Sequence, residues 1–328
     1  MILEVLRQEH VLSRAFASFF SLGAVVVYNR GEVAPREGSA VYFGAFEYEE
    51  GSKMANKSGA LSVLKIAKMK EAGEKIAMVT AYDFPTAQMA DAAGLDMILV
   101  GDSVGTVVQG RATTLGVTLD EMIYHSKMVA KGAKRALVVV DIPFPYCQLG
   151  PAEAVRACAR VLLETEATAV KIEAGASRAD TVRAVVEAGI PVLGHCGLAP
   201  QSIKAAGGYI IQRDVDKLVA DCLAIQDAGA FAIVLECVQS DLAEEISKKL
   251  RVPTVGIGSG AGCDGQVLVF HDLFNYTNKE PNETPKHARV YCDLHKLIDK
   301  GFREYVADVK SGAFPSAAES FAPKPVRS

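Results

Sequence analysis

Residues 136–175 read ALVVVDIPFPYCQLGPAEAVRACARVLLETEATAVKIEAG, and this stretch decides the fold. It begins with an apolar run rich in valine (136–144) and ends with a second apolar run (169–175). Between them, residues 151–165 have the apolar spacing of a helix that starts at Pro151. Parallel strands need a crossover of a dozen or more residues, which a helix usually supplies. The stretch therefore predicts two parallel strands joined by a helix, with both faces of each strand buried.

The same alternation extends outward in both directions and gives eight apolar runs, most of them separated by helices. The runs cover residues 75–83, 97–102, 136–144, 169–175, 191–197, 231–237, 254–260 and 266–272. Eight such units predict an α/β fold of the closed (β/α)₈ type, the TIM barrel. A doubly wound open sheet is the structural alternative. It usually has fewer strands and a phosphate-binding fingerprint after the first strand, which is missing here.

Helices are predicted between the strands and at both ends of the barrel. Between the strands they cover residues 85–94, 118–132, 151–165, 177–189, 214–229 and 241–250. Thr118 is the expected N-cap of the second of these helices, and Gly132 its expected end. Residues 58–73 are expected to form an extra helix that caps the bottom of the barrel. Residues 284–311 are expected to supply the final helix or helices.

Length and composition limit the class of protein. A chain of 328 residues fits two domains or one barrel, and its 50% apolar content with a net charge of −4 excludes general disorder. An acidic pI near 5.9 argues against nucleic acid as the main partner. No apolar run reaches the roughly 18 residues of a membrane span. Seven cysteines without a CxxC pair indicate reduced thiols in a reducing compartment.

The first 53 residues lack the order of the rest. They contain an apolar stretch (15–27) preceded by both arginines and glutamates, which suits neither a secretory nor a mitochondrial leader well. They are interpreted as a disposable extension or as a weak targeting segment. Residues 54–328 are predicted to form a single catalytic barrel domain with C-terminal helices and a tail. The expected compartment is the cytoplasm, or the mitochondrion if residues 1–53 are a transit segment.

Polar residues gather where the predicted strands end, which is where TIM barrels place their active sites. Asp102, Asp141 and Glu173 come from three consecutive strands and are expected to converge on one point. Three hard oxygen donors with no nearby cysteine or multiple histidines favour Mg²⁺. The alternative is that each acid only caps the following helix.

Further polar residues lie at the same end. Lys171 offers a positive charge for a substrate carboxylate, or else forms a salt bridge with Glu173. Glu236 follows an apolar run that would raise its pKa, as a general base needs; otherwise it supports His195 or Lys171. His195 is either an active-site residue or a structural one.

Two other features carry weaker signals. His271 and Asp272, at the end of the eighth run, are interpreted as structural. GIGSGAG (256–262) could approach a ligand closely, but it matches neither the P-loop nor the dinucleotide-binding spacing.

Together these groups favour one chemistry. A metal would chelate a 2-oxo acid through its carboxylate and carbonyl oxygens and would acidify the adjacent C–H bond by stabilising an enolate. Glu236 would remove the proton, and the enolate would attack an electrophile that the residues do not name.

Several blocks resemble a known family, in its order and over about residues 56–318. They include ILVGDSVG (98–105), AVKIEAG (169–175), GHCGLAPQS (194–202), VLECV (234–238) and VGIGSGAGCDGQVLVFHD (255–272). The chain is identified as resembling the ketopantoate hydroxymethyltransferase family. The resemblance implies a barrel of the phosphoenolpyruvate/pyruvate type and transfer of a one-carbon unit from 5,10-methylenetetrahydrofolate to 3-methyl-2-oxobutanoate. The product would be 2-dehydropantoate, used for pantothenate and coenzyme A synthesis.

The same resemblance implies roles for the residues at the matching positions of this sequence. Asp102, Asp141 and Glu173 match the Mg²⁺ positions, and Asp102, Ser103, Asp141 and Lys171 match the contacts to the oxo acid. Glu236 matches the proton acceptor, and His195 matches a further active-site position. The family pattern also implies a homodecamer.

The chain departs from the family pattern in three places. Residues 1–53 have no counterpart, GGYIIQRDVDK (207–217) looks shortened, and HDLFNYT (271–277) replaces a more usual stretch. Two other functions are considered. A lyase or phosphonomutase would be expected to carry a reactive cysteine in a KKCGH-type loop, and none is visible. A non-enzymatic barrel would be expected to have lost one of the five charged residues, yet all are present.

Overall fold

Eight parallel strands pair in sequence order and close into a barrel, with β1 lying between β2 and β8. The predicted closed barrel is therefore confirmed, and the open-sheet alternative is wrong. This computed structural model describes residues 59–208, 213–277 and 285–321. The strands are β1 (Ile76–Thr80), β2 (Met97–Val100), β3 (Leu137–Asp141), β4 (Ala169–Glu173), β5 (Val192–Gly197), β6 (Ala232–Glu236), β7 (Thr254–Ile257) and β8 (Gly265–Leu268).

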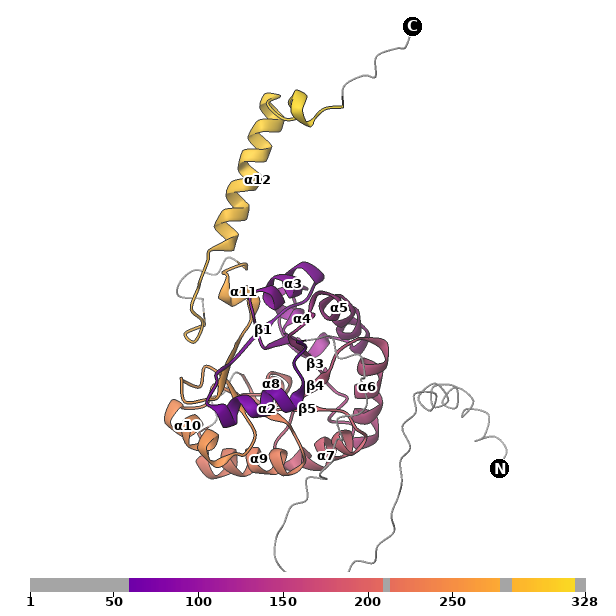
Figure 1. Cartoon of the computed structure of the whole chain (residues 1–328), viewed down its shortest axis with the longest axis vertical. Helices are drawn as coiled ribbons and strands as arrows, with labels where there is room; N and C mark the ends of the chain where they lie inside the picture. Colours follow the sequence, from indigo (N-terminus) through magenta and orange to yellow (C-terminus); the bar gives the residue numbers. More distant parts are fainter. Residues whose placement is uncertain (1–58, 209–212, 278–284, 322–328) are drawn as a thin grey trace, which may run out of the picture. The chain divides into compact units, whose positions relative to one another are not determined.

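Most of the helices follow the strands and surround the barrel, whereas α12 (Leu294–Ser311) lies apart from this ring (Figure 1). The longer ones are α2 (Val63–Ala72), α3 (Phe84–Ala92), α5 (Leu119–Gly132), α6 (Pro151–Glu164), α7 (Ala179–Glu187), α9 (Val215–Asp227), α10 (Ser240–Lys249) and α12 (Leu294–Ser311). The short ones are α4 (Val104–Val107), α8 (Ile203–Ala206), α11 (Phe270–Leu273), η2 (Thr114–Gly116), η3 (Ala176–Arg178), η4 (Pro200–Ser202) and η5 (Ala317–Glu319).

Two apolar layers hold the barrel together. Alternate residues of each strand point inward, and Met97, Leu99, Leu137, Val139 and Leu193 belong to the inner cluster. The residues between them face outward and pack against the helices in a second, larger cluster. Both faces of the strands are thus buried, which explains why the sequence shows continuous aliphatic runs instead of alternation.

The expected capping helix is present as α2. Ser62 caps its first turn, and Gly73 ends it in the left-handed conformation that glycine adopts without strain. Ile66 is completely buried and packs in the same cluster as the inward residues of the strands. Because this contact closes the amino-terminal end of the barrel, the carboxyl-terminal end is left for a ligand.

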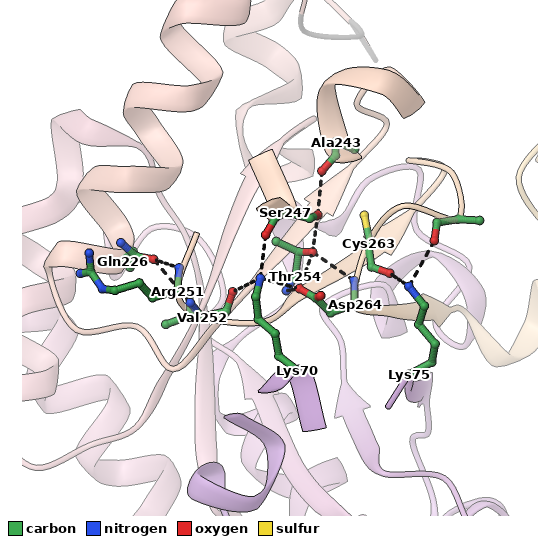
Figure 2. A network of polar contacts seen from close by, with 11 residues as sticks. Lys70, Lys75, Gln226, Ala243, Ser247, Arg251, Val252, Thr254, Cys263 and Asp264 are labelled. Carbon is green, nitrogen blue, oxygen red and sulfur yellow. Dashed lines mark hydrogen bonds and ion pairs between the residues drawn. The ribbon is translucent and has the colours of Figure 1, made fainter. Parts of the chain in front are cut away.

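A polar network fixes α2 in place (Figure 2). Lys70 Nζ donates to Asp264 Oδ2 at 2.9 Å and to the carbonyl oxygens of Ser247 and Val252 at 2.7 and 3.1 Å. Asp264 Oδ2 also accepts from the backbone N–H of Thr254 at 2.8 Å. Each buried polar atom of this network therefore has a protein partner, as a purely structural cluster requires.

The helix α5 ends at Gly132, as expected. An added Cβ at Gly132 would lie 2.6 Å from the Phe84 carbonyl oxygen, so this glycine also permits close helix packing. Two other local expectations need correction. The eighth run yields a strand only to Leu268, and His271 and Asp272 lie in α11. The last helix starts at Leu294, and none of its side chains is buried.

Some expectations lie outside the described residues. The chain divides after Lys53, but residues 1–53 are not among those described, so their role stays a prediction. The same holds for residues 209–212 of the shortened loop. Over the described ranges, no helix is both long enough and apolar enough to cross a membrane. All seven cysteines are free thiols, which agrees with the absence of a disulfide framework.

Candidate active site

The inward face of the barrel changes from apolar to charged at its carboxyl-terminal end. Asp141, Lys171, Glu173, His195 and Glu236 each come two or four residues after an inward aliphatic side chain of the same strand. Strand register places Lys171 beside Asp141, and His195 beside Glu173. The period of two along each strand thus carries these side chains to one end of the barrel.

The centre of the site is an ion pair. Lys171 Nζ lies 2.5 Å from Asp141 Oδ1, and both side chains are buried. Burial disfavours the ammonium, but the charges of Asp141, Asp102 and Glu173 outweigh it, so the pKa of Lys171 is raised. The sequence left open a bridge from Lys171 to Glu173; the bonded partner is Asp141.

Asp102 lies against this pair. Its backbone N–H donates to Asp141 Oδ2 at 3.1 Å. Burial and the nearby charge of Asp141 raise the pKa of Asp102 to about 6. Gly101 fits the tight turn that carries Asp102, because a Cβ at Gly101 would lie 2.7 Å from Ser103 Oγ.

Gln201 joins two of the acids, and sequence reasoning missed it. Its side-chain Nε2 donates to Asp102 Oδ2 and to the carbonyl oxygen of Ile142, both at 3.0 Å. Its backbone N–H donates to Glu173 Oε2, also at 3.0 Å. Gln201 lies in the block GHCGLAPQS, so the signal for it was a polar residue shortly after the fifth strand.

The chemistry of the three acids fits a divalent cation. Asp102, Asp141 and Glu173 are buried carboxylates with a single ammonium, Lys171, among them. Burial and the charge of Asp102 raise the pKa of Glu173 well above its usual value, so these carboxylates hold excess negative charge at a cost. A cation with oxygen ligands would remove that cost, and Mg²⁺ typically takes one or two carboxylates together with water and substrate oxygens.

The three carboxylates are grouped less closely than the sequence predicts. In the described part of the chain, no group of three or more histidine, cysteine, aspartate or glutamate side chains lies close enough to hold a metal ion. The structure brings Asp102 and Asp141 together and connects Glu173 to Asp102 through Gln201. It does not bring all three carboxylates to one point.

Glu236 and His195 form the next part of the site. Burial raises the pKa of Glu236 to about 7, although Lys171 opposes the shift. His195 Nε2 lies 3.5 Å from Glu236 Oε2 and 2.8 Å from the carbonyl oxygen of Leu198. Burial, reinforced by the charge of Lys171, lowers the pKa of His195 well below its usual value, so the ring is neutral and the contact is no ion pair.

The tautomer of His195 follows from these contacts. Because the Leu198 carbonyl accepts from Nε2, that nitrogen carries the proton and Nδ1 is an acceptor. Nδ1 is buried and has no hydrogen-bond partner within the described residues. An unsatisfied buried acceptor of this kind is typical of a site that a ligand completes.

Ser103 is held by a residue that the sequence did not single out. The hydroxyl of Tyr82, which is buried, lies 2.8 Å from Ser103 Oγ. Ser103 precedes α4 but makes no capping bond with its side chain, so its hydroxyl serves the contact with Tyr82.

The weaker candidates have structural surroundings. His271 is buried with its ring 5.6 Å from that of Tyr82. In the glycine-rich segment, a Cβ at Gly260 would lie 2.5 Å from Ser240 Cβ, and one at Gly262 would lie 2.5 Å from Glu244 Cβ. These two glycines therefore let the segment pack on α10, and they approach a helix, not a ligand.

Fold and site together define a class: a parallel (β/α)₈ barrel with a buried, carboxylate-rich site at the ends of its strands. Solved structures share this fold. A phosphoenolpyruvate phosphomutase from Streptomyces platensis subsp. rosaceus superposes with a TM-score of 0.53 at 16% identity, covering 80% of this chain and 92% of that one. A 2,3-dimethylmalate lyase of the PEP mutase/isocitrate lyase superfamily gives 0.52 at 18% identity, covering 80% and 89%.

Sequence comparison then identifies the family within this class. The profile of the family described as ketopantoate hydroxymethyltransferase matches residues 60–317. A 3-methyl-2-oxobutanoate hydroxymethyltransferase of Rhodopirellula baltica is 51% identical over 256 residues, which span 78% of this chain and 94% of that protein. One from Trichlorobacter lovleyi is 48% identical over 264 residues, spanning 80% and 98%. The chain belongs to the ketopantoate hydroxymethyltransferase family.

Proposed function

We propose that the protein transfers a hydroxymethyl group from 5,10-methylenetetrahydrofolate to 3-methyl-2-oxobutanoate, giving 2-dehydropantoate for pantothenate and coenzyme A synthesis. Family membership and relatives at about half identity over most of the chain support this activity. The single observation that carries the mechanism is Glu236, a carboxyl group with a pKa of about 7 at the rim of the buried Asp141–Lys171 pair.

In the proposed site, Lys171 attracts the carboxylate of the oxo acid, and Ser103 donates to one of its oxygens. Asp102 and Asp141 would hold Mg²⁺ together with Glu173. When bound, the cation draws electron density from the oxo group and makes the C3–H bond acidic. Lys171 and Gln201 keep the carboxylates in position by the bonds described above.

Glu236 is the proposed base. A carboxyl group with a pKa near neutrality has the basicity to take a proton and is still ionised in part of the population. It removes the C3 proton, and C3 forms a bond to the methylene carbon of the folate as one of the two C–N bonds of that carbon breaks. Water then displaces the second nitrogen from the methylene carbon, and the two folate nitrogens take up one proton from water and the proton held by Glu236. Water supplies the hydroxyl oxygen, and tetrahydrofolate leaves. Because His195 is neutral, it adds no second positive charge beside Glu236, and Lys171 alone lowers the pKa of that carboxyl group.

The proposal is tested by exchange of the C3 proton of 3-methyl-2-oxobutanoate in D₂O with Mg²⁺ and without folate. The wild type is expected to exchange it, and Glu236→Gln to exchange it at least about a hundredfold more slowly, the usual contribution of a general base. Exchange at the wild-type rate in the variant would show that another group is the base. Formation of 2-dehydropantoate after addition of the folate then separates this transferase from a lyase or mutase.

Compartment and assembly belong to the same proposal. Seven free thiols support a reducing compartment, and we propose the cytoplasm. We also propose a homodecamer, with small-molecule ligands and neither nucleic acid nor membrane as partner. The mass of the purified protein in solution tests the assembly.

A further inference from the structure

An aromatic hollow borders the proposed oxo-acid site. It has a volume of about 500 Å³ and lies among the loops that follow β1, β2 and β8 and the first turns of α5. Six rings line it: Tyr82, Tyr124, His125, Phe270, His271 and Tyr276. His271 and Tyr276 are stacked, with ring centroids 5.1 Å apart and planes inclined by 27°. Such a lining suits a flat, conjugated ligand, which gains by stacking and by edge-to-face contact.

One side chain separates this hollow from the reacting groups. Tyr82 lines the hollow, and its hydroxyl lies 2.8 Å from Ser103 Oγ. A ring system in the hollow would therefore lie next to an oxo acid held by Ser103. A second substrate that must react with that acid needs such a position.

A cationic hollow adjoins the aromatic one. It has a volume of about 620 Å³ and is lined by Phe84, Lys127, Met128, Lys131 and Lys134. Met128 lines both hollows, so they lie side by side along α5. Lys127 lies 3.8 Å from Glu164, whereas Lys131 and Lys134 form no salt bridge with any described residue. The three ammonium groups thus offer a site for an anionic chain that leads away from the rings.

We propose that these two hollows bind the folate donor, a role that rests on the function proposed above. The aromatic hollow takes the reduced pterin and aminobenzoyl rings, and the lysine hollow takes the glutamate tail through its carboxylates. The order of the two hollows fixes the direction of the ligand, because the ring end lies beside Ser103 and the tail end lies along α5. The lysines make the site selective for donors with more than one glutamate.

Two variants test the two halves of this site. Tyr124→Ala removes the ring of a residue that is 63% exposed, and it is expected to raise the KM for 5,10-methylenetetrahydrofolate about tenfold, as loss of one stacking partner does. Tyr124→Phe keeps the ring and should leave that KM within about twofold of wild type. The double variant Lys131→Ala/Lys134→Ala should raise the KM for the triglutamate about fivefold or more, and that for the monoglutamate less than about twofold.

The controls separate this inference from the function on which it rests. Lys248→Ala, an exposed lysine of α10 paired with Glu244, should change neither constant. Folate-free C3 exchange is measured in each variant. If exchange is normal and product forms, but Tyr124→Ala and the lysine variant keep wild-type KM values for both donors, the donor site is wrong and the transferase stands. If the wild type neither exchanges the proton nor forms product, the function fails and the donor site fails with it.

Discussion

The two ends of the barrel both contain a lysine–aspartate pair, partly buried at the amino-terminal end and buried at the carboxyl-terminal end, and the two pairs have different surroundings. At the amino-terminal end, Lys70 and Asp264 are surrounded by backbone partners that satisfy both (Figure 2). At the carboxyl-terminal end, Lys171 serves one aspartate while two more buried carboxyl groups lie nearby without a cation of their own. We call the amino-terminal end balanced, because its charged groups are paired, and the carboxyl-terminal end unbalanced, because its carboxyl groups outnumber its ammonium group. A balanced cluster stabilises the fold, whereas an unbalanced one keeps affinity for a ligand. This agrees with the general division of TIM barrels into a stability face and a catalytic face.

The largest expected effect comes from removing the cation of the unbalanced end. Lys171→Met leaves Asp141 without its bonded ammonium and removes the positive charge offered to the oxo acid. Truncating one partner of a buried charge pair costs about 2–5 kcal/mol in binding, so kcat/KM for the oxo acid should fall about a hundredfold or more. A kcat/KM within fivefold of wild type would show that the oxo acid is held elsewhere.

The second largest effect is expected at Gln201, which holds Asp102 at the carboxyl-terminal end. Gln201→Met keeps the volume and the backbone bond to Glu173 but removes the amide that holds Asp102. Loss of a partner that orients a metal ligand usually costs ten- to a hundredfold in metal affinity. We expect Mn²⁺ binding, followed by electron paramagnetic resonance without substrate, to weaken about tenfold. Unchanged Mn²⁺ affinity would reduce Gln201 to a packing residue.

Lys70→Met is the matching change at the balanced end. It removes three hydrogen bonds of one ammonium and leaves two carbonyl groups and Asp264 with fewer partners. The free energy of unfolding by urea should fall by about 2 kcal/mol. KM and kcat of the folded enzyme should not change, since the site lies at the other end. A loss of activity without a loss of stability would remove the distinction between the two ends.

The last effect concerns pH and stability in Mg²⁺-free buffer. The pKa of Glu236 is about 7 in the folded chain against 4.5 without burial, so the folded state binds the proton more tightly. Its contribution to stability is therefore present below about pH 4.5 and is lost as the pH rises to about 7. Glu236→Gln should be more stable relative to wild type at pH 8 than at pH 5, as measured by thermal unfolding. Equal differences at both pH values would argue against burial of this carboxyl group.

The sequence was sufficient for the barrel because local and global signals agree. Continuous aliphatic runs such as Leu137–Asp141 are typical of strands buried on both faces, and Thr118 has the capping box that its spacing to Glu121 predicts. The predicted eighth strand is too long because the apolar residues after Leu268 continue the run, while the chain itself turns into α11. Apolar content alone does not show where a strand ends.

The site was only partly predictable for a related reason. Residues at strand ends, such as Lys171 and Glu236, are fixed by strand period and could be found by counting. Gln201 and Tyr82 lie in loops, and their contacts with Asp102 and Ser103 depend on how those loops fold back over the barrel. No spacing rule encodes such contacts. For the same reason, three acids at one rim indicated a common site but not the distances between their carboxylates.

The central claim is that Glu236 takes the C3 proton of the oxo acid at the unbalanced end of the barrel. The most direct test is the rate of C3 proton exchange as a function of pH, with saturating Mg²⁺ and no folate. The base must be ionised, so the exchange rate should rise with pH and level off above an apparent pKa of about 7. Glu236→Gln should show neither this rise with pH nor the wild-type exchange rate. A wild-type rate that does not change between about pH 5.5 and 8.5, or a variant that keeps the rise, would contradict the account.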